Sequence, residues 1–129
     1  MSQVRIYGHR ESLTRNRNAL SDTIHSCLVD ALGLPESKRF HRFVPMESED
    51  LVYPDDRSDS YTIIEISMFS GRSTETKKRL IRLLFERIEA DVGIVPRDVE
   101  ITIHESDPAS WGIRGRCGDE LMLDYDVNT

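Results

Sequence analysis

The chain repeats itself at an offset of 60 residues. When the sequence is shifted by this offset, apolar residues fall on apolar residues, and a glycine near the end of each matched stretch falls on a glycine. The matched pairs are Val4 with Ile64, Ile6 with Ile66, Leu20 with Leu80, Ile24 with Leu84, Leu28 with Ile88 and Gly33 with Gly93. Because the pairs keep the same order along both halves, they predict two copies of one supersecondary unit.

The hydrophobic spacing changes in the same way within each copy. Each copy opens with an alternating segment, 4–8 in the first and 64–68 in the second, which is typical of a half-buried strand. Apolar residues then recur at helical spacing. These residues are Leu13, Leu20, Ile24, Cys27, Leu28 and Ala31 in the first copy, with Thr76, Leu80, Leu83, Leu84 and Ile88 in the second. Ser73 is placed to cap the second helix, and Gly33 and Gly93 stand where a left-handed C-terminal residue is favoured.

A second extended segment closes each copy, at about 39–47 and 98–105. A strand, a helix and a strand that returns to the same sheet form a right-handed parallel crossover unit. Two such units predict an α/β (two-layer α+β) fold with tandem β-α-β repeats. We expect a four-stranded mixed sheet, two helices on one face, and short strands in the C-terminal segment, where 121–127 is strand-like. A ferredoxin-like β-α-β-β-α-β module fits the same periodicity.

The length and the apolar content predict one domain. A chain of 129 residues with 38% hydrophobic residues can build a single core. We expect that domain to span 1–129. Repeat 1 then covers about 2–48, an exposed loop 49–60, repeat 2 about 61–106, and a C-terminal segment 107–129.

Charge and composition exclude several classes of function. The net charge of -6 argues against binding to nucleic acid, because such binding draws its affinity from clustered Lys and Arg. No apolar run approaches the roughly 18 residues of a membrane span, and no signal-peptide stretch follows the start, so we expect a cytoplasmic protein without a membrane contact. Neither the cysteines Cys27 and Cys117 nor the four histidines show metal-ligand spacing, so we expect no metal. No motif in the sequence implies a cofactor either, and we expect none.

Several short motifs carry a family resemblance along nearly the whole chain. They are the segment Ser67 to Lys78, Gly33-Leu34-Pro35-Glu36-Ser37, Pro96-Arg97-Asp98-Val99 and Trp111-Gly112. In this order they resemble the tautomerase superfamily, and within it the malonate semialdehyde decarboxylase-like subgroup. The resemblance is closer still to short bacterial members that share 56–59, 111–115 and 123–126 and lack the N-terminal proline.

The resemblance implies a place for the reacting amine and for the substrate. The family uses an N-terminal proline, exposed when the initiator methionine is removed, and Ser2 occupies that place here. A free α-amine has a reference pKa of about 7.7 to 8.0, which suits a general base near neutral pH. Arg72 matches an arginine that binds the substrate carboxylate, a task for which the planar guanidinium is suited. Trp111 either lines the pocket or belongs to the core. From the residues themselves, Arg39 on a closing strand is a further candidate for substrate binding, and Arg114 in its glycine-rich turn either binds a carboxylate or is solvated.

At other positions this chain differs from the decarboxylase, and these differences limit which activities of the family we expect. The decarboxylase's second arginine is replaced by Ser70, its aspartate by Lys38 and an aromatic residue by Ile113. We therefore expect neither decarboxylase nor hydratase activity. What the resemblance implies is a homotrimeric tautomerase that acts on a small carboxylated keto or enol metabolite. The alternative is a non-catalytic protein that binds a small carboxylate on the same fold.

Overall fold

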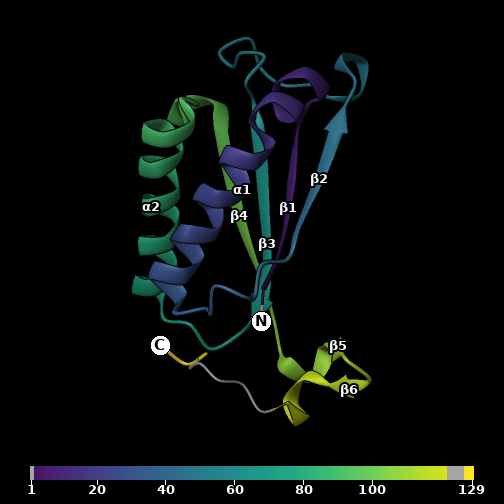
Figure 1. Cartoon of the computed structure of the whole chain (residues 1–129), viewed down its shortest axis with the longest axis vertical. Helices are drawn as coiled ribbons and strands as arrows, with labels where there is room; N and C mark the ends of the chain where they lie inside the picture. The colour runs from purple at the N-terminus through teal and green to yellow at the C-terminus, as the bar shows by residue number, and fades with distance from the viewer. Residues whose placement is uncertain (1, 122–126) are drawn as a thin grey trace.

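The computed structural model describes residues 2–121 and 127–129, and it confirms a two-layer α/β fold in which two helices cover one face of a four-stranded sheet (Figure 1). The elements of the two layers are β1 (Ser2–His9), α1 (Arg10–Leu32), β2 (His41–Met46), β3 (Thr62–Phe69), α2 (Thr74–Val92) and β4 (Val99–Ser106). None of the described helices is long and apolar enough to cross a membrane.

The order of the strands in the sheet is β2-β1-β3-β4. Each outer strand runs parallel to the first strand of its own repeat, whereas β1 and β3 run antiparallel at the centre. A ferredoxin-like module is therefore wrong, because each crossover here returns to the neighbouring position and no strand is inserted between its two strands. The antiparallel register places Ser2 opposite Met68, so the start of β1 lies beside the end of β3.

The core consists of the residues that the internal repeat aligns. The members of the aligned apolar pairs all belong to one core cluster between the helices and the sheet, and each is at most 1% exposed. Cys27 lies in the same core as a free thiol, and burial raises its pKa to about 11. At neutral pH this thiol is protonated, so it serves as a small apolar side chain.

The helix ends follow the local signals in the sequence, with one exception. Gly33 and Gly93 end the helices with φ of 70° and 82°, the left-handed region that glycine tolerates best. The Ser73 hydroxyl accepts a hydrogen bond from the main-chain N–H of Thr76 and caps α2. The exception is α1, which begins at Arg10 with no side-chain cap among the described residues.

The closing strands are shorter or shifted relative to the sequence prediction. Strand β2 begins at His41, so Arg39 precedes it, and β4 ends at Ser106. After β4 the chain forms a small antiparallel hairpin of β5 (Gly112–Ile113) and β6 (Arg116–Cys117), which extends beyond the end of the main sheet (Figure 1). Most of the strand-like stretch 121–127 lies outside the described residues.

Candidate functional site

The pairing of β1 with β3 brings Ser2 close to the start of α2. Strand β3 ends at Phe69, and the chain turns into α2 through Gly71, whose φ of 125° belongs to the left-handed region. Ser2 and Arg72 are both buried, at 4% and 7% exposure, and they line the same small cavity. The structure thus places the two residues predicted for the reacting amine and for carboxylate binding at one site.

The walls of this cavity are mainly apolar. Besides Ser2 and Arg72, its lining residues are Leu32, Leu34, Met68, Phe69 and Val127. The cavity measures about 10 Å³, which is close to the room that one water molecule requires. A charged group in such surroundings loses hydration, which makes the Arg72 guanidinium a favourable partner for an anion.

The backbone near Arg72 also favours anions. Arg72 precedes Ser73, the cap of α2, and the N-terminus of a helix carries a partial positive charge with free N–H groups. Its Nη1 donates a hydrogen bond of 3.0 Å to the Oγ1 atom of Thr129. The residue is therefore held in place by the end of the described chain, and its guanidinium already binds an oxygen atom.

Trp111 contacts a residue that lines the cavity, Phe69. Its ring meets Phe69 edge to face, with 5.2 Å between the ring centroids, and its indole N–H donates to the Ser106 hydroxyl at 2.8 Å. Because Phe69 lines the cavity and Trp111 supports Phe69, Trp111 positions a wall of the site. It is not one of the described residues that line the cavity itself.

Arg39 and Arg114 are not brought to the cavity. Arg39 donates to the exposed Asp22 at 2.7 Å and to the half-buried Ser21 at 3.3 Å, both on α1. Arg114 is exposed in the turn between β5 and β6, with a φ of 50°. Neither side chain belongs to the described lining of the cavity, so a role in substrate binding stays a prediction for both.

A larger groove lies at the opposite end of the sheet, and sequence reasoning did not find it. It has a volume of about 960 Å³ and is lined by the start of α1, the end of β2 and residues 59–60. The repeat makes the junction of β1 and α1 the counterpart of the junction of β3 and α2. At that junction Ser12 stands in the place of Arg72, and Arg10 forms an ion pair with Glu47. The groove therefore lacks the buried arginine that marks the first site.

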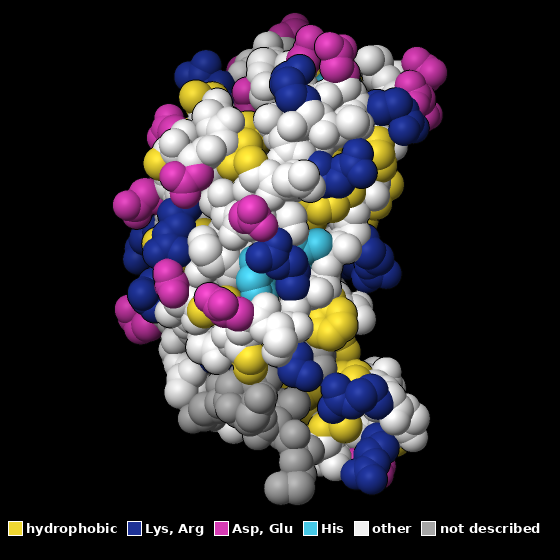
Figure 2. Space-filling view, viewed as in Figure 1, with side chains coloured by type: hydrophobic (Ala, Val, Ile, Leu, Met, Phe, Trp, Pro, Cys, Tyr) yellow, Lys and Arg dark blue, Asp and Glu magenta, His cyan; other side chains and the backbone are white. Residues whose placement is uncertain are grey.

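Two histidines pack between α1 and the start of β2, and neither lines the cavity or the larger groove. The rings of His25 and His41 lie 6.0 Å apart, and the Nδ1 atom of His41 is 2.8 Å from the Ser21 hydroxyl. Burial lowers the pKa of His41 to about 4, with a further contribution from His25 and Arg39, so this ring is neutral at pH 7. Histidine side chains reach the face seen in Figure 2 among interspersed acidic and basic groups.

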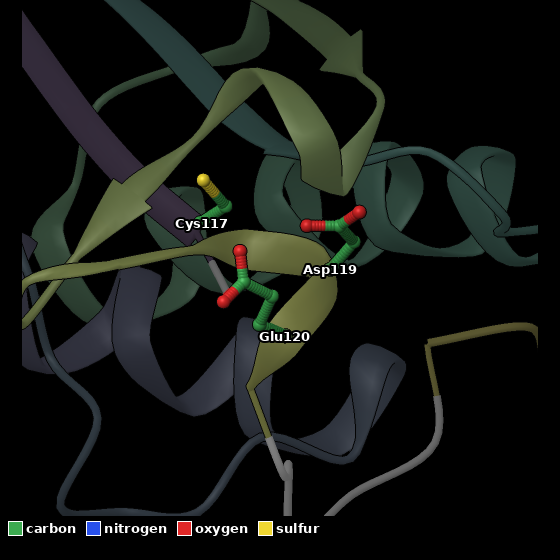
Figure 3. Close-up of side chains that lie close together, drawn as sticks. All are labelled: Cys117, Asp119 and Glu120. Atoms are coloured by element: carbon green, nitrogen blue, oxygen red, sulfur yellow. The ribbon is translucent and has the colours of Figure 1, made fainter.

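Cys117, at the end of β6, forms a cluster of potential metal ligands with Asp119 and Glu120 in the turn that follows (Figure 3). The ligand atoms of the three residues lie within 4.8 Å of one another, and all three side chains are exposed. Exposed acidic groups often lie together without an ion. The cluster by itself therefore does not indicate a metal site, and the sequence prediction of no metal stays a prediction.

Comparison with known proteins supplies a family context for this geometry. The family model for tautomerase enzymes matches residues 38–114. A protein of Bacillus subtilis (strain 168), the probable tautomerase YrdN, is 31% identical over 97 residues, which cover 71% of this chain and 74% of that protein. The crystal structure of malonate semialdehyde decarboxylase aligns with a TM-score of 0.81 at 26% identity, over 92% of this chain and 99% of that one. An asymmetric trimer of a fused 4-OT protein shares the fold at 16% identity, with a TM-score of 0.79 over 91% of this chain and 96% of that one.

Proposed function

Because this chain belongs to the tautomerase family, we propose that it is a cytoplasmic tautomerase that acts on a small carboxylated keto or enol metabolite. The observation that carries the proposal is the shared cavity of Ser2 and Arg72. The burial of both residues supports it, since a polar residue and an arginine seldom lie under apolar cover without a role. The malonate semialdehyde decarboxylase-like subgroup is the part of the superfamily to which we assign the chain.

The proposed chemistry moves one proton. The α-amine of Ser2, freed by removal of Met1, takes the hydroxyl proton of the enol and returns a proton to its carbon, which gives the keto form. Arg72 holds the carboxylate next to this amine through paired hydrogen bonds. The apolar lining from Leu32, Leu34 and Phe69 shields the amine and the reacting atoms from water.

The site does not favour decarboxylation or hydration. Both would need further groups to orient water and the substrate carboxylate, and the three positions at which the family supplies them carry Ser70, Lys38 and Ile113. The Ser70 hydroxyl donates to Asp107 at 3.1 Å, so it is turned toward the segment after β4. Tautomerisation requires only a base and a group that binds the carboxylate, the two roles proposed here for Ser2 and Arg72.

The alternative proposal is a binding protein that keeps the arginine but has lost the base. The intact mass of the chain, expressed without an N-terminal tag, separates the two. We expect the measured mass to be that of a chain without Met1, because a small residue at position 2 favours removal of the initiator methionine. A retained Met1 would displace the α-amine from the cavity and would leave carboxylate binding as the better description.

We propose a homotrimer, and we expect light scattering to report three times the chain mass of 14.9 kDa. The helices cover one face of the sheet, and on the other face Val44 remains 38% exposed beside the half-buried Tyr7. Burying this face against other copies removes apolar surface from water. Val44→Glu should shift the protein toward the monomer, whereas Val52→Glu, at a 91% exposed position in the loop after β2 and not on the sheet, should have a smaller effect. A monodisperse monomer at micromolar concentration would contradict the proposal.

A further inference from the structure

The last three residues of the described chain, 127–129, lie across the candidate site, and we call them the C-terminal strap. Three side chains at the start of α2 hold Thr129. Arg72 Nη1 donates to its hydroxyl at 3.0 Å, and the hydroxyls of Ser73 and Thr76 reach its main-chain oxygen at 3.0 and 2.7 Å. Figure 1 shows this end of the chain beneath α2, at the same end of the sheet as the N-terminus. The strap thus binds the groups that a ligand would use.

The strap packs closely on the turn that precedes Arg72. A Cβ atom at Gly71 would lie 2.5 Å from Oδ1 of Asn128 and 2.8 Å from the main-chain oxygen of Val127, which is closer than side chains approach in proteins. Val127 also forms part of the lining of the cavity. The strap is therefore fitted to this turn along its whole length, and the contact at Thr129 is not an isolated one.

The contacts of Thr129 resemble those of a bound carboxylate. Two oxygen atoms of one residue are held by a guanidinium and two hydroxyls at a helix N-terminus, a setting that favours negative charge. Resting on the function proposed above, we infer that Thr129 occupies the position of the ligand carboxylate in the free protein. We also infer that Ser73 and Thr76 bind the ligand together with Arg72.

Thr76 is the main hydroxyl donor of this site. The single hydroxyl proton of Ser73 is shared between two acceptors at 3.0 Å, the Thr76 Oγ1 atom and the main-chain oxygen of Thr129. The Thr76 hydroxyl lies closer to Thr129, at 2.7 Å. A ligand oxygen that replaces Thr129 should therefore depend more on Thr76 than on Ser73.

The size of the cavity makes the strap a competitor of the ligand. A space of about 10 Å³ holds one water, so a carboxylic acid with several carbon atoms fits only after the strap leaves. The apparent affinity for such a ligand is then reduced by the fraction of chains in which the site is open. If the strap covers the site in nine of ten chains, its removal tightens binding about tenfold.

The test measures binding of phenylpyruvate by calorimetry to the full chain and to a chain without residues 127–129. We expect the deletion to tighten binding about tenfold. Thr129→Val, which loses the oxygen that Arg72 binds, should give part of this gain, and Thr129→Ser, which keeps it, should bind like the full chain. Thermal melts of each variant check that the fold is retained.

A second measurement tests the hydroxyl donor in the chain without the strap. Thr76→Val should weaken phenylpyruvate binding by roughly tenfold, as expected for one hydrogen bond to a charged group. Thr74→Val, at an exposed position of the same helical turn, is the matched control and should change little. Equal effects of the two substitutions would overturn the assignment of Thr76.

The outcomes separate this inference from the proposed function. If the full chain binds phenylpyruvate and the deletion leaves the affinity unchanged or weakens it, the strap is not a competitor, while carboxylate binding stands. If neither chain binds phenylpyruvate at millimolar concentration and both are folded, the proposed function fails and the inference fails with it.

Discussion

Leu84→Ala should lower the free energy of unfolding by about 2 to 5 kcal/mol, the range measured for large-to-small changes in protein cores. The side chain is 0% exposed and belongs to the core cluster between the helices and the sheet. Its truncation removes apolar contacts and leaves a cavity that rigid neighbours on both sides cannot fill. Urea unfolding followed by circular dichroism, at one fixed protein concentration, measures the change.

Two further substitutions make this test specific to the repeat. Ile24 is the counterpart of Leu84 in the first copy and is equally buried, so Ile24→Ala should cost a similar amount. Leu83 is adjacent to Leu84 but only partly buried, so Leu83→Ala should cost clearly less. A loss at Leu83 as large as that at Leu84 would contradict the assignment of the core face of α2.

The core could be predicted from the sequence because two independent patterns indicate the same residues. Helical spacing alone marks Leu80, Leu84 and Ile88 as one face, and the offset of 60 marks their counterparts in α1. The glycines at 33 and 93 add the helix ends. Each of these signals is local, or a relation between two local signals, so no knowledge of the tertiary structure is needed.

The start of α1 and the contacts of the C-terminal segment could not be predicted. Helix α1 begins without a capping side chain among the described residues, and Glu11 in its first turn is too weak a signal to fix where the helix starts. Thr129 reaches Arg72 across 57 positions of sequence, and a polar residue near the end of a chain carries no periodic signal. Contacts of this kind depend on the packed structure as a whole.

The identity of the two main residues of the candidate site and their proximity rest on different kinds of evidence. Family resemblance indicated both Ser2 and Arg72, but only the antiparallel register of β1 and β3 explains why residues so distant in sequence share one cavity. That register was open at the sequence level, because crossover units fix the parallel pairs and leave the central pair undetermined. Arg39 and Arg114 matched the same chemistry on residue type alone, and the structure places both away from the cavity.

Ser2→Pro should raise the rate of enol-to-keto tautomerisation of an aryl pyruvate enol. If the pocket around Arg72 binds the carboxylate and only the base is poor, proline supplies a more basic and conformationally fixed secondary amine at the same place. The assay follows the enol absorbance with each purified variant. Mass spectrometry first confirms that residue 2 is the true N-terminus.

Arg72→Ala in the Ser2→Pro background should remove this gain. Paired hydrogen bonds from a guanidinium to a carboxylate contribute roughly 2 to 4 kcal/mol, so kcat/KM should fall by about 30- to 1000-fold. Arg39→Ala in the same background is the matched control, because Arg39 is held by Asp22 outside the cavity, and it should leave the rate nearly unchanged. If Ser2→Pro folds and assembles normally yet gives no rate above buffer, the cavity has diverged from the family chemistry. Carboxylate binding without catalysis would then describe the site better, because Arg72 would still offer its guanidinium beside an amine that moves no proton.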